Sequence, residues 1–204
     1  MTSFDKLVAL FREFPGIGPR QAKRFVFFLL SRDKEYITSL KNLIEELPKD
    51  VARCASCFRF FQKRAGALCT LCSDKNRSES ELMVVATDTD LDTIEKSGGF
   101  KGRYFVLGGN IPLLPKKKAP PIIRLKELLT RVEKDSAAEL KEIILALSAN
   151  PDGEHTSDEL RKALSPLAST HGFRISTLGR GLSTGSELEY ADSETIKQAL
   201  THRG

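Results

Sequence analysis

The four cysteines constrain this chain more than any other feature of its sequence. They form two Cys-x-x-Cys pairs that fall within 19 residues. Each pair offers two thiolates on a tight turn, and two such pairs complete a tetrahedron suited to Zn²⁺. Four sulfur ligands leave no position for water, so we predict one structural zinc per chain and no catalytic metal. The predicted ligands are Cys54, Cys57, Cys69 and Cys72.

An iron–sulfur centre also uses four cysteines, and a redox-active pair uses two. Two pairs this close together favour a metal site, and zinc over iron. So short a module cannot build its own hydrophobic core, so metal binding has to supply part of its folding free energy. We expect three aromatic residues to pack around the site, namely Phe58, Phe60 and Phe61. Four cations in the module permit contact with DNA without implying it: Arg53, Arg59, Lys63 and Arg64.

Charge is distributed unevenly along the 204 residues. The net charge is +5, yet residues 1–64 alone carry +6 and the remaining 140 carry −1. A basic N-terminal part is typical of a protein that faces a polyanion, although a solvated basic surface has the same composition. The longest apolar run, Phe25 to Leu30, is far shorter than the ~20 residues that span a bilayer. With no secretory signal at the N-terminus, we expect a cytoplasmic protein.

The hydrophobic pattern divides the chain into blocks. Residues 2–47 have apolar positions at helical spacing, and the polar residues 73–81 are typical of a linker after the cysteine module. From Leu82 onward, strands alternate with helices, which predicts a mainly parallel sheet with both faces covered. The predicted strands are Leu82–Ala86, Tyr104–Leu107, Glu142–Ala146 and Phe173–Leu178. The predicted helices lie near 90–97, 122–134, 157–169 and 192–201.

We therefore predict a multidomain α+β protein. Its expected parts are a helical module at 1–53, a zinc finger at 54–72, an α/β domain at 82–178 and a C-terminal segment at 179–204 that serves oligomerisation. Residues 108–121 contain four prolines and three consecutive lysines. Proline is excluded from helix interiors and central strands, so we expect an exposed basic loop there.

A glycine-rich turn joins the first two predicted helices, in the run Phe14-Pro-Gly-Ile-Gly-Pro-Arg20. Gly16 and Gly18 reach backbone angles closed to other residues and let a ligand approach closely. A proline suits the first turn of a helix, and the free amides there attract anions. Three cations follow the turn: Arg20, Lys23 and Arg24. We interpret this segment as a DNA-backbone site; the alternative is a tight turn without a ligand.

Acidic residues follow two predicted strands, where open parallel sheets collect their ligands. Asp88, Asp90 and Asp92 follow the first strand, and Asp152 and Glu154 follow the third, in a loop expected at 150–156. Such a cluster could hold Mg²⁺ beside phosphates. Helix caps and first-turn acids would give the same pattern, and both interpretations stay open.

In this order, a helix-hairpin-helix, a four-cysteine finger and an α/β domain resemble the RecR family of recombination mediators over essentially the whole chain. Further matching stretches are Gly102-Arg-Tyr-Phe-Val-Leu107, Asn150-Pro-Asp-Gly-Glu-His-Thr156 and Gly185-Ser-Glu-Leu-Glu189. The resemblance implies a Toprim-type α/β domain and a homo-oligomer, from a dimer to a ring of four, that clamps DNA. It further implies that Gly16, Gly18, Arg20, Lys23 and Arg24 contact DNA and that Asp152 and Glu154 bind partners.

The same resemblance implies cooperation with RecO, and with RecF, in loading RecA at single-stranded gaps during DNA repair, in a nucleoid-associated protein. One departure is informative: the family usually ends its first Toprim strand in Val-Val-Glu, and this chain has Val84-Val85-Ala86. Because alanine neither ligates metal nor moves protons, we expect no enzymatic activity. The alternatives are a Mg²⁺-dependent Toprim nuclease or topoisomerase-like enzyme using Asp88, Asp90, Asp152 and Glu154, and a zinc-ribbon transcription accessory.

Overall fold

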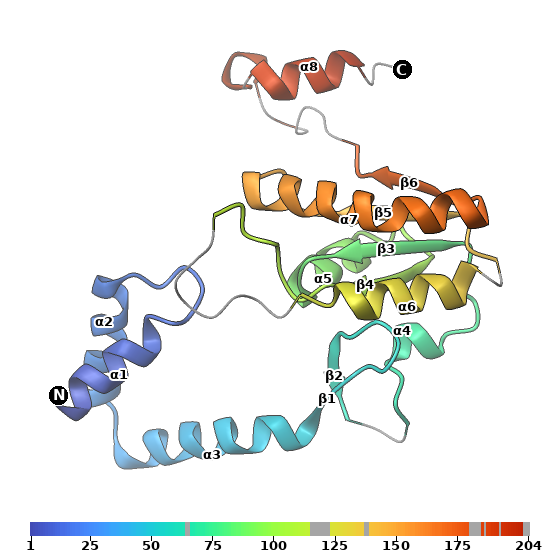
Figure 1. Ribbon diagram of the computed structural model, residues 1–204. Coiled ribbons are helices and arrows are strands. Elements are labelled where there is room, and N and C mark those ends of the chain that lie inside the picture. The colour runs from blue at the N-terminus through green and yellow to red at the C-terminus, as the bar shows by residue number, and fades with distance from the viewer. Residues whose placement is uncertain are drawn as a thin grey trace. The chain divides into compact units, whose positions relative to one another are not determined.

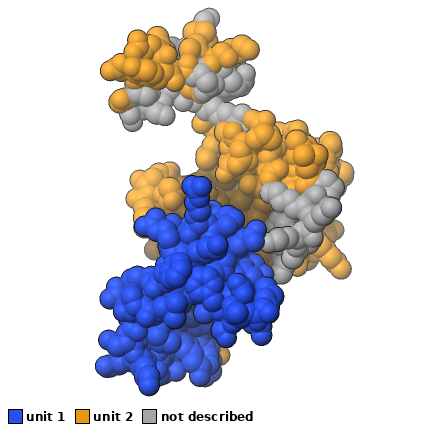
Figure 2. All heavy atoms as spheres, turned by 90° about the vertical axis from the view of Figure 1, so that its left-hand side faces the viewer, with its two compact units in different colours: residues 1–52 blue, residues 53–204 orange. Residues whose placement is uncertain are grey.

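The computed structural model describes residues 1–63, 66–114, 123–136, 139–179, 185, 187–191 and 193–201. Two compact units make up the chain, residues 1–52 and residues 53–204, and Figure 2 shows them in different colours. The cysteine module belongs to the second unit, together with the α/β domain. Among the described residues, no helix combines the length and apolarity needed to cross a membrane.

The first unit consists of three helices, α1 (Ser3–Phe11), α2 (Pro19–Leu30) and α3 (Lys34–Asp50). Each has a start signal in its sequence. Thr2 and Asp5 form a capping box on α1, and the Asp33 carboxylate accepts from the Tyr36 amide at 2.7 Å at the start of α3. Pro19 occupies the first turn of α2, where its missing N–H has no consequence. The predicted helical block is thus three helices.

The cysteine module begins with a small sheet of two strands, β1 (Val51–Arg53) and β2 (Phe60–Gln62). A short helix, α4 (Thr70–Ser73), follows and carries the last cysteine. Figure 1 shows β1, β2 and α4 next to the helix α6 (Leu125–Ser136) of the α/β domain.

A four-stranded parallel sheet forms the centre of the second unit, in the order β4-β3-β5-β6. Its strands are β3 (Glu81–Val85), β4 (Arg103–Val106), β5 (Glu142–Ala146) and β6 (Arg174–Thr177). In this register Val84 stands beside Phe105 on one side and Leu145 on the other. The parallel sheet predicted from the alternating pattern is therefore confirmed.

Alternate residues of the strands fill two cores. Leu82 and Val84 face the larger core with Leu128 of α6 and Leu160 of α7 (Pro151–His171), whereas Met83 and Val85 face the smaller core. The helix α5 (Asp88–Ser97) covers that second face through Leu91 (Figure 1). Because side chains of a strand alternate between faces, covering both faces requires the continuous apolar runs seen here.

The start of α7 corrects one expectation. Residues 150–156 were expected to be a loop, but α7 begins at Pro151. The Asn150 side chain accepts from the Gly153 amide at 2.8 Å, and proline occupies the first helical position. Asp152 and Glu154 are consequently first-turn residues of a helix, where the helix dipole favours acids.

A short 3₁₀ helix (Leu188–Tyr190) and α8 (Ser193–Thr201) follow the sheet, as expected for the last predicted helix. The three consecutive lysines at 116–118 and most of the glycine-containing connection at 179–185 lie outside the described residues.

Candidate metal centre and nucleic-acid interface

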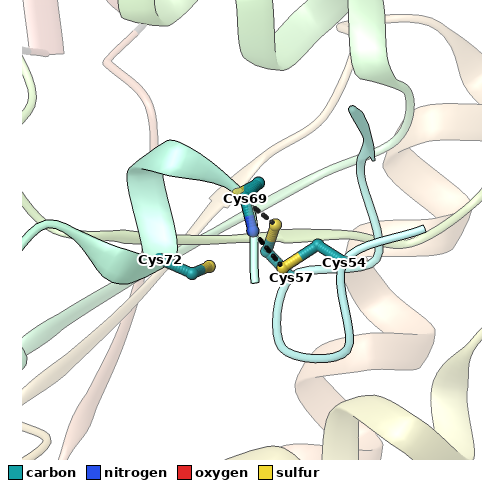
Figure 3. A group of neighbouring side chains, drawn as sticks. All are labelled: Cys54, Cys57, Cys69 and Cys72. Atoms are coloured by element: carbon teal, nitrogen blue, oxygen red, sulfur yellow. Dashed lines mark hydrogen bonds between the residues drawn. The ribbon is translucent and has the colours of Figure 1, made fainter. Parts of the chain in front are cut away.

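The four predicted ligands come together in one cluster (Figure 3). Their sulfur atoms all lie within 4.8 Å of one another, and Cys54, Cys57 and Cys69 are buried. The Sγ atoms of Cys57 and Cys69 are 3.6 Å apart, and the Cys69 amide donates to the Cys54 Sγ at 3.4 Å. Two cysteines come from the turn between β1 and β2, and the other two lie at and within α4.

The cluster fits a tetrahedral metal ion. Ligands about 2.3 Å from a zinc ion lie about 3.8 Å from one another in a tetrahedron, close to the 3.6 Å between the sulfur atoms of Cys57 and Cys69. The hydrogen bond between the thiols of Cys54 and Cys57 lowers the pKa of Cys54 and raises the pKa of Cys57. The group is the one cluster of three or more potential ligands found among the described residues. The four sulfur atoms are therefore placed so that they could hold a metal ion.

Hydrogen bonds attach the cysteine module to the α/β domain. The Val106 amide at the end of β4 donates to the Cys57 carbonyl at 2.8 Å. Arg131 of α6 donates to the Ser56 carbonyl at 3.0 Å, and the Arg103 guanidinium donates to the carbonyls of three residues: Leu71, Cys72 and Asp74. The module therefore packs against the sheet as part of one unit.

The aromatic residues of the module correct a second expectation. Phe61 packs against the cysteine cluster as predicted. Phe58, at φ 63°, instead packs on Phe105 in the core of the α/β domain, with ring centroids 5.3 Å apart. Phe60 is 49% exposed and is not among the described hydrophobic residues that pack on the cysteine cluster. Neighbouring residues of a strand face opposite sides, so Phe60 and Phe61 cannot both face the cysteines.

The segment at 73–81 is not a free linker. Arg77 is buried and makes a two-point ion pair with Glu95 of α5, at 2.8 and 2.9 Å. The same guanidinium donates to the Gly102 carbonyl at 2.9 Å. This ion pair raises the pKa of Arg77 and lowers the pKa of Glu95. The polar composition of the segment does not reveal that Arg77 is buried, and the contacts of Arg77 fix the path of the segment.

The glycine turn joins α1 to α2. Gly16 adopts φ +74°, in the left-handed region, and the Ile17 amide donates to the Phe14 carbonyl at 3.1 Å. Gly18 is the N-cap of α2 with φ −82°, so it does not use the unusual angle expected of it. A Cβ atom at either glycine would have open space around it. The turn is therefore accessible to a ligand within the described part of the chain.

The three cations of the turn lie on one face of α2 because they are three and four residues apart. All three are exposed, and none forms an ion pair among the described residues: Arg20, Lys23 and Arg24. Gly18 provides no side-chain cap, and the amides of the first turn have no intrahelical acceptor. Amides and cations thus form a positive surface at the start of α2.

The acids after β3 are engaged in structure. Asp90 completes a capping box with Thr87 at the start of α5, with hydrogen bonds of 2.9 and 3.4 Å. Asp88 accepts from the Phe60 amide at 2.7 Å, and Asp92 pairs with Arg59 at 3.0 Å. The first acids of α5 therefore cap the helix and hold the cysteine module.

Asp152 accepts from the Leu113 amide at 3.0 Å, so it connects α7 to the segment after β4. Glu154 is exposed in the same helical turn. Beside Asp152, the Thr156 hydroxyl is buried and accepts from the Ile111 amide at 2.8 Å. These contacts favour a structural role for Asp152 and leave Glu154 on the surface.

Three family models match the sequence. They describe a RecR helix-hairpin-helix at residues 4–47, a Toprim domain at 80–179 and a RecR C-terminal region at 181–203. Curated relatives with the name recombination protein RecR match almost end to end. Those of Prochlorococcus marinus and Herpetosiphon aurantiacus are 35% and 36% identical over 98% and 97% of this chain, and 94% and 92% of their own. That of Lactobacillus acidophilus is 32% identical over 97% of this chain and 94% of its own. On this similarity and the fold described above, the chain belongs to the RecR family.

Proposed function

We propose that this protein is a DNA-binding mediator of recombinational DNA repair. It works with RecO, and with RecF, to promote loading of RecA at single-stranded gaps. Its relatives bear the name recombination protein, and its first unit matches a helix-hairpin-helix of this family. The positive surface at the start of α2 is the observation that carries the proposal.

The proposed chemistry is contact with the DNA backbone. The open amides at the start of α2 donate to phosphate oxygens, and the dipole of the helix favours the negative charge. Arg20, Lys23 and Arg24 add charge on the same face. Contacts of this kind position a protein without reading bases, so binding is sequence-tolerant and weakens steeply with salt.

The proposed metal is zinc, in a structural role. Four buried or half-buried sulfur donors suit Zn²⁺ and leave no coordination position for water. When bound, the ion stabilises the fold of the module and supplies no catalytic step. The residues of the chain then hold the module against α6 and the end of β4.

We further propose that the protein is not an enzyme. Ala86 stands where Toprim enzymes carry a glutamate, and the acids of α5 cap that helix or bind the cysteine module. The acids after β3 and β5 form no cluster of three or more among the described residues. Nicking of supercoiled DNA with Mg²⁺, abolished by Asp152→Ala, would overturn this proposal.

The protein is proposed to act as a homo-oligomer, from a dimer to a ring of four. Its first unit exposes large apolar side chains that soluble monomers usually cover. Phe27 of α2 is 60% exposed, and Leu43, Ile44 and Leu47 of α3 are 61–62% exposed. Light scattering with and without gapped DNA tests this, and a strict monomer in both measurements would contradict it.

The experiment for the DNA site compares two charge-reversal pairs with the same change in net charge. Arg20→Glu with Arg24→Glu should abolish most binding of a labelled gapped DNA in fluorescence anisotropy. Lys34→Glu with Lys41→Glu, on exposed positions of α3, is the matched control and should lose far less affinity. Equal effects of the two pairs would remove the helix-hairpin-helix from the mechanism.

Partner binding is tested separately. Asp152→Asn with Glu154→Gln should weaken binding of RecO in titration calorimetry while DNA affinity is unchanged. Because Asp152 also accepts from Leu113, the single Glu154→Gln variant controls for a structural effect. If both variants bind RecO as the unchanged protein does, these residues have no part in the partner contact.

A further inference from the structure

Cys72 differs from the other three cysteines of the cluster in its exposure. Cys54, Cys57 and Cys69 have at most 1% of their surface exposed, whereas Cys72 is half-buried. The two hydrogen bonds drawn in Figure 3 join those three cysteines and leave out Cys72. The cluster is therefore closed to solvent at three of its ligands and partly open at the fourth.

A cavity of about 840 Å³ lies between the cysteine module and α6. Ser56 and Leu68 line it from the module, and Thr130 and Arg131 line it from α6. Of the four described cysteines, Cys72 alone belongs to its wall. A water molecule occupies about 30 Å³ in the liquid, so this volume admits small reagents. The cavity therefore gives a small neutral molecule a route to Cys72.

The Cys72 sulfur also lacks N–H donors that would reduce its reactivity. A thiol that binds a metal is deprotonated, and the thiolate is the form of cysteine that reacts with electrophiles. Among the hydrogen bonds of the described residues, the one amide that donates to a sulfur of the cluster is that of Cys69, at 3.4 Å from the Cys54 Sγ. When bound to a metal, Cys72 is thus an accessible thiolate whose charge no described N–H group shares.

A second thiolate lies close enough to form a disulfide with Cys72. The four sulfur atoms all lie within 4.8 Å of one another. Cys69 is the N-cap of α4, and Cys72 follows three residues later in the same short helix. This is the Cys-x-x-Cys spacing at which redox proteins form and break disulfides reversibly. Cys69 is therefore the partner that the local structure favours.

We propose that Cys72 is an oxidation site, which hydrogen peroxide reaches through the cavity beside α6, and that oxidation converts the proposed zinc site into a disulfide between Cys69 and Cys72. The proposal rests on the proposed zinc. It goes beyond the proposed function, because it makes the fold of the cysteine module depend on the oxidants around the protein.

The proposed reaction has two steps. The Cys72 thiolate attacks one oxygen of hydrogen peroxide, the O–O bond breaks, and hydroxide leaves, so that Cys72 becomes a sulfenic acid. The Cys69 thiolate then attacks the Cys72 sulfur, the S–O bond breaks, and a second hydroxide leaves as the S–S bond forms. Each hydroxide takes up a proton from solvent. Two thiolates thus lose two electrons, and one peroxide is reduced to two water molecules.

Oxidation should weaken the attachment of the module to the α/β domain. The two thiolates that remain are too few to hold zinc in a closed site. The Cys72 carbonyl accepts from Arg103 at 3.1 Å, and the Cys57 carbonyl accepts from the Val106 amide at 2.8 Å, so loss of the ion disturbs both contacts. The thermal midpoint should therefore fall on oxidation, and a thiol reductant with added zinc should restore it.

The test uses the zinc-loaded full chain. Hydrogen peroxide should release about one zinc per chain, followed with a colorimetric chelator, as two thiols are lost. Peptide mapping should find the disulfide between Cys69 and Cys72. In a separate reaction, a substoichiometric amount of N-ethylmaleimide, a small neutral thiol reagent, should label Cys72 before the three buried cysteines.

Two threonine variants test the cavity as the route. Thr130 lines the cavity, whereas Thr170 of α7 does not; both are exposed, and their hydroxyls donate to the carbonyl four residues earlier, at 3.1 and 2.9 Å. Thr130→Phe adds a ring to the wall of the cavity and should slow zinc release several-fold. Thr170→Phe should release zinc at the rate of the unchanged protein. Thermal melting before oxidation identifies a variant that fails to fold.

Three results would overturn the oxidation site. They are zinc retained under peroxide that fully oxidises glutathione in the same buffer, a first disulfide or first label that leaves out Cys72, and equal release rates for the two threonine variants. Each of them leaves the zinc and the DNA-binding function standing. A protein isolated without zinc would instead refute the proposed cofactor, and the oxidation site with it.

Discussion

Arg131 of α6 donates to the carbonyl oxygen of Ser56 at 3.0 Å, in the turn between the first two cysteines. The same guanidinium forms an ion pair with Asp135, one turn further along the helix. Ser56 is 75 residues from Arg131 in sequence, so this bond joins the cysteine module directly to the α/β domain. Neither the spacing of the cysteines nor the pattern of α6 predicts it.

Loss of this bond should destabilise the second unit. Arg131→Gln removes a charge-assisted hydrogen bond from a half-buried site, which typically costs about 1.5–3 kcal/mol. We expect a lower urea midpoint for Arg131→Gln and little change for Lys134→Gln, which removes an exposed cation of the same helix. Equal midpoints for the two variants would show that the docking of the module contributes nothing to stability.

Much of the fold follows from local pattern. The parallel strands are continuous apolar runs, and each predicted strand matches an observed one within one residue at either end. The observed start of α7 differs from the predicted one, because Pro151 and Gly153 are also typical of turns. Asn150 and Pro151 are nevertheless an N-cap and a first helical residue, which is the signal that could have placed the helix start.

The sequence likewise predicts some of the candidate functional residues and misses others. The cysteine cluster depends on spacing within 19 residues, so the sequence predicts it. Arg77 and Arg124 were missed because their burial depends on tertiary packing. Glu95, the partner of Arg77, is 18 residues away, and Arg124 donates to a carbonyl of a neighbouring strand across an equal separation. No local pattern distinguishes such arginines from solvated ones.

The ion pair between Arg77 and Glu95 predicts a pH dependence of stability. The hydrogen bonds from Arg77 lower the folded-state pKa of Glu95 below its ordinary 4.5. The carboxylate therefore stabilises the fold above pH 4.5, and this contribution is lost as the pH falls through the lower folded-state value. The free energies of unfolding in urea of the unchanged protein and of Glu95→Gln should differ most near pH 7 and become equal in acid.

Glu79 provides the control for this measurement. It pairs with Arg103 at 2.9 Å, but its side chain is 64% exposed, so water screens the interaction. Glu79→Gln should change stability little at any pH. A difference between Glu95→Gln and the unchanged protein that stays constant down to strong acid would contradict the assignment of the pH dependence to Glu95.

Metal removal should unfold the cysteine module and loosen the contacts it makes. Elemental analysis should find about one zinc per chain, as a closed site with four sulfur ligands requires. Chelation should lower the thermal midpoint and expose amides of residues 53–73 to hydrogen exchange, because metal binding supplies folding free energy to such a module. A brown, iron-containing protein would refute the choice of zinc.

Cys57→Ser and Cys72→Ser compare a buried with a half-buried ligand. Serine is a poor zinc ligand, so both variants should lose metal. Cys57→Ser should be the less stable, since the Cys57 side chain is fully buried with its sulfur 3.6 Å from the Cys69 sulfur. Full zinc content in either variant would mean that three cysteines suffice.

The two glycines of the α1–α2 turn should respond differently to substitution. Gly16→Ala places a Cβ atom in the left-handed region at φ +74°, which costs about 1–2 kcal/mol, although the surrounding space is open. Gly18 has an ordinary φ of −82° and caps α2, so Gly18→Ser should cost nothing and add a few tenths of a kcal/mol as a better N-cap. Hydrogen exchange over residues 3–30 measures both effects.

Gly18→Ser should change DNA affinity in the opposite direction to stability. Its serine variant occupies the open space in front of the first-turn amides, and the hydroxyl accepts the hydrogen bonds that a phosphate would otherwise accept. Gly18→Ser should therefore be at least as stable as the unchanged protein and bind DNA more weakly. A stable Gly18→Ser variant with unchanged affinity would show that the phosphate does not approach the backbone at the start of α2, and that the three cations act alone.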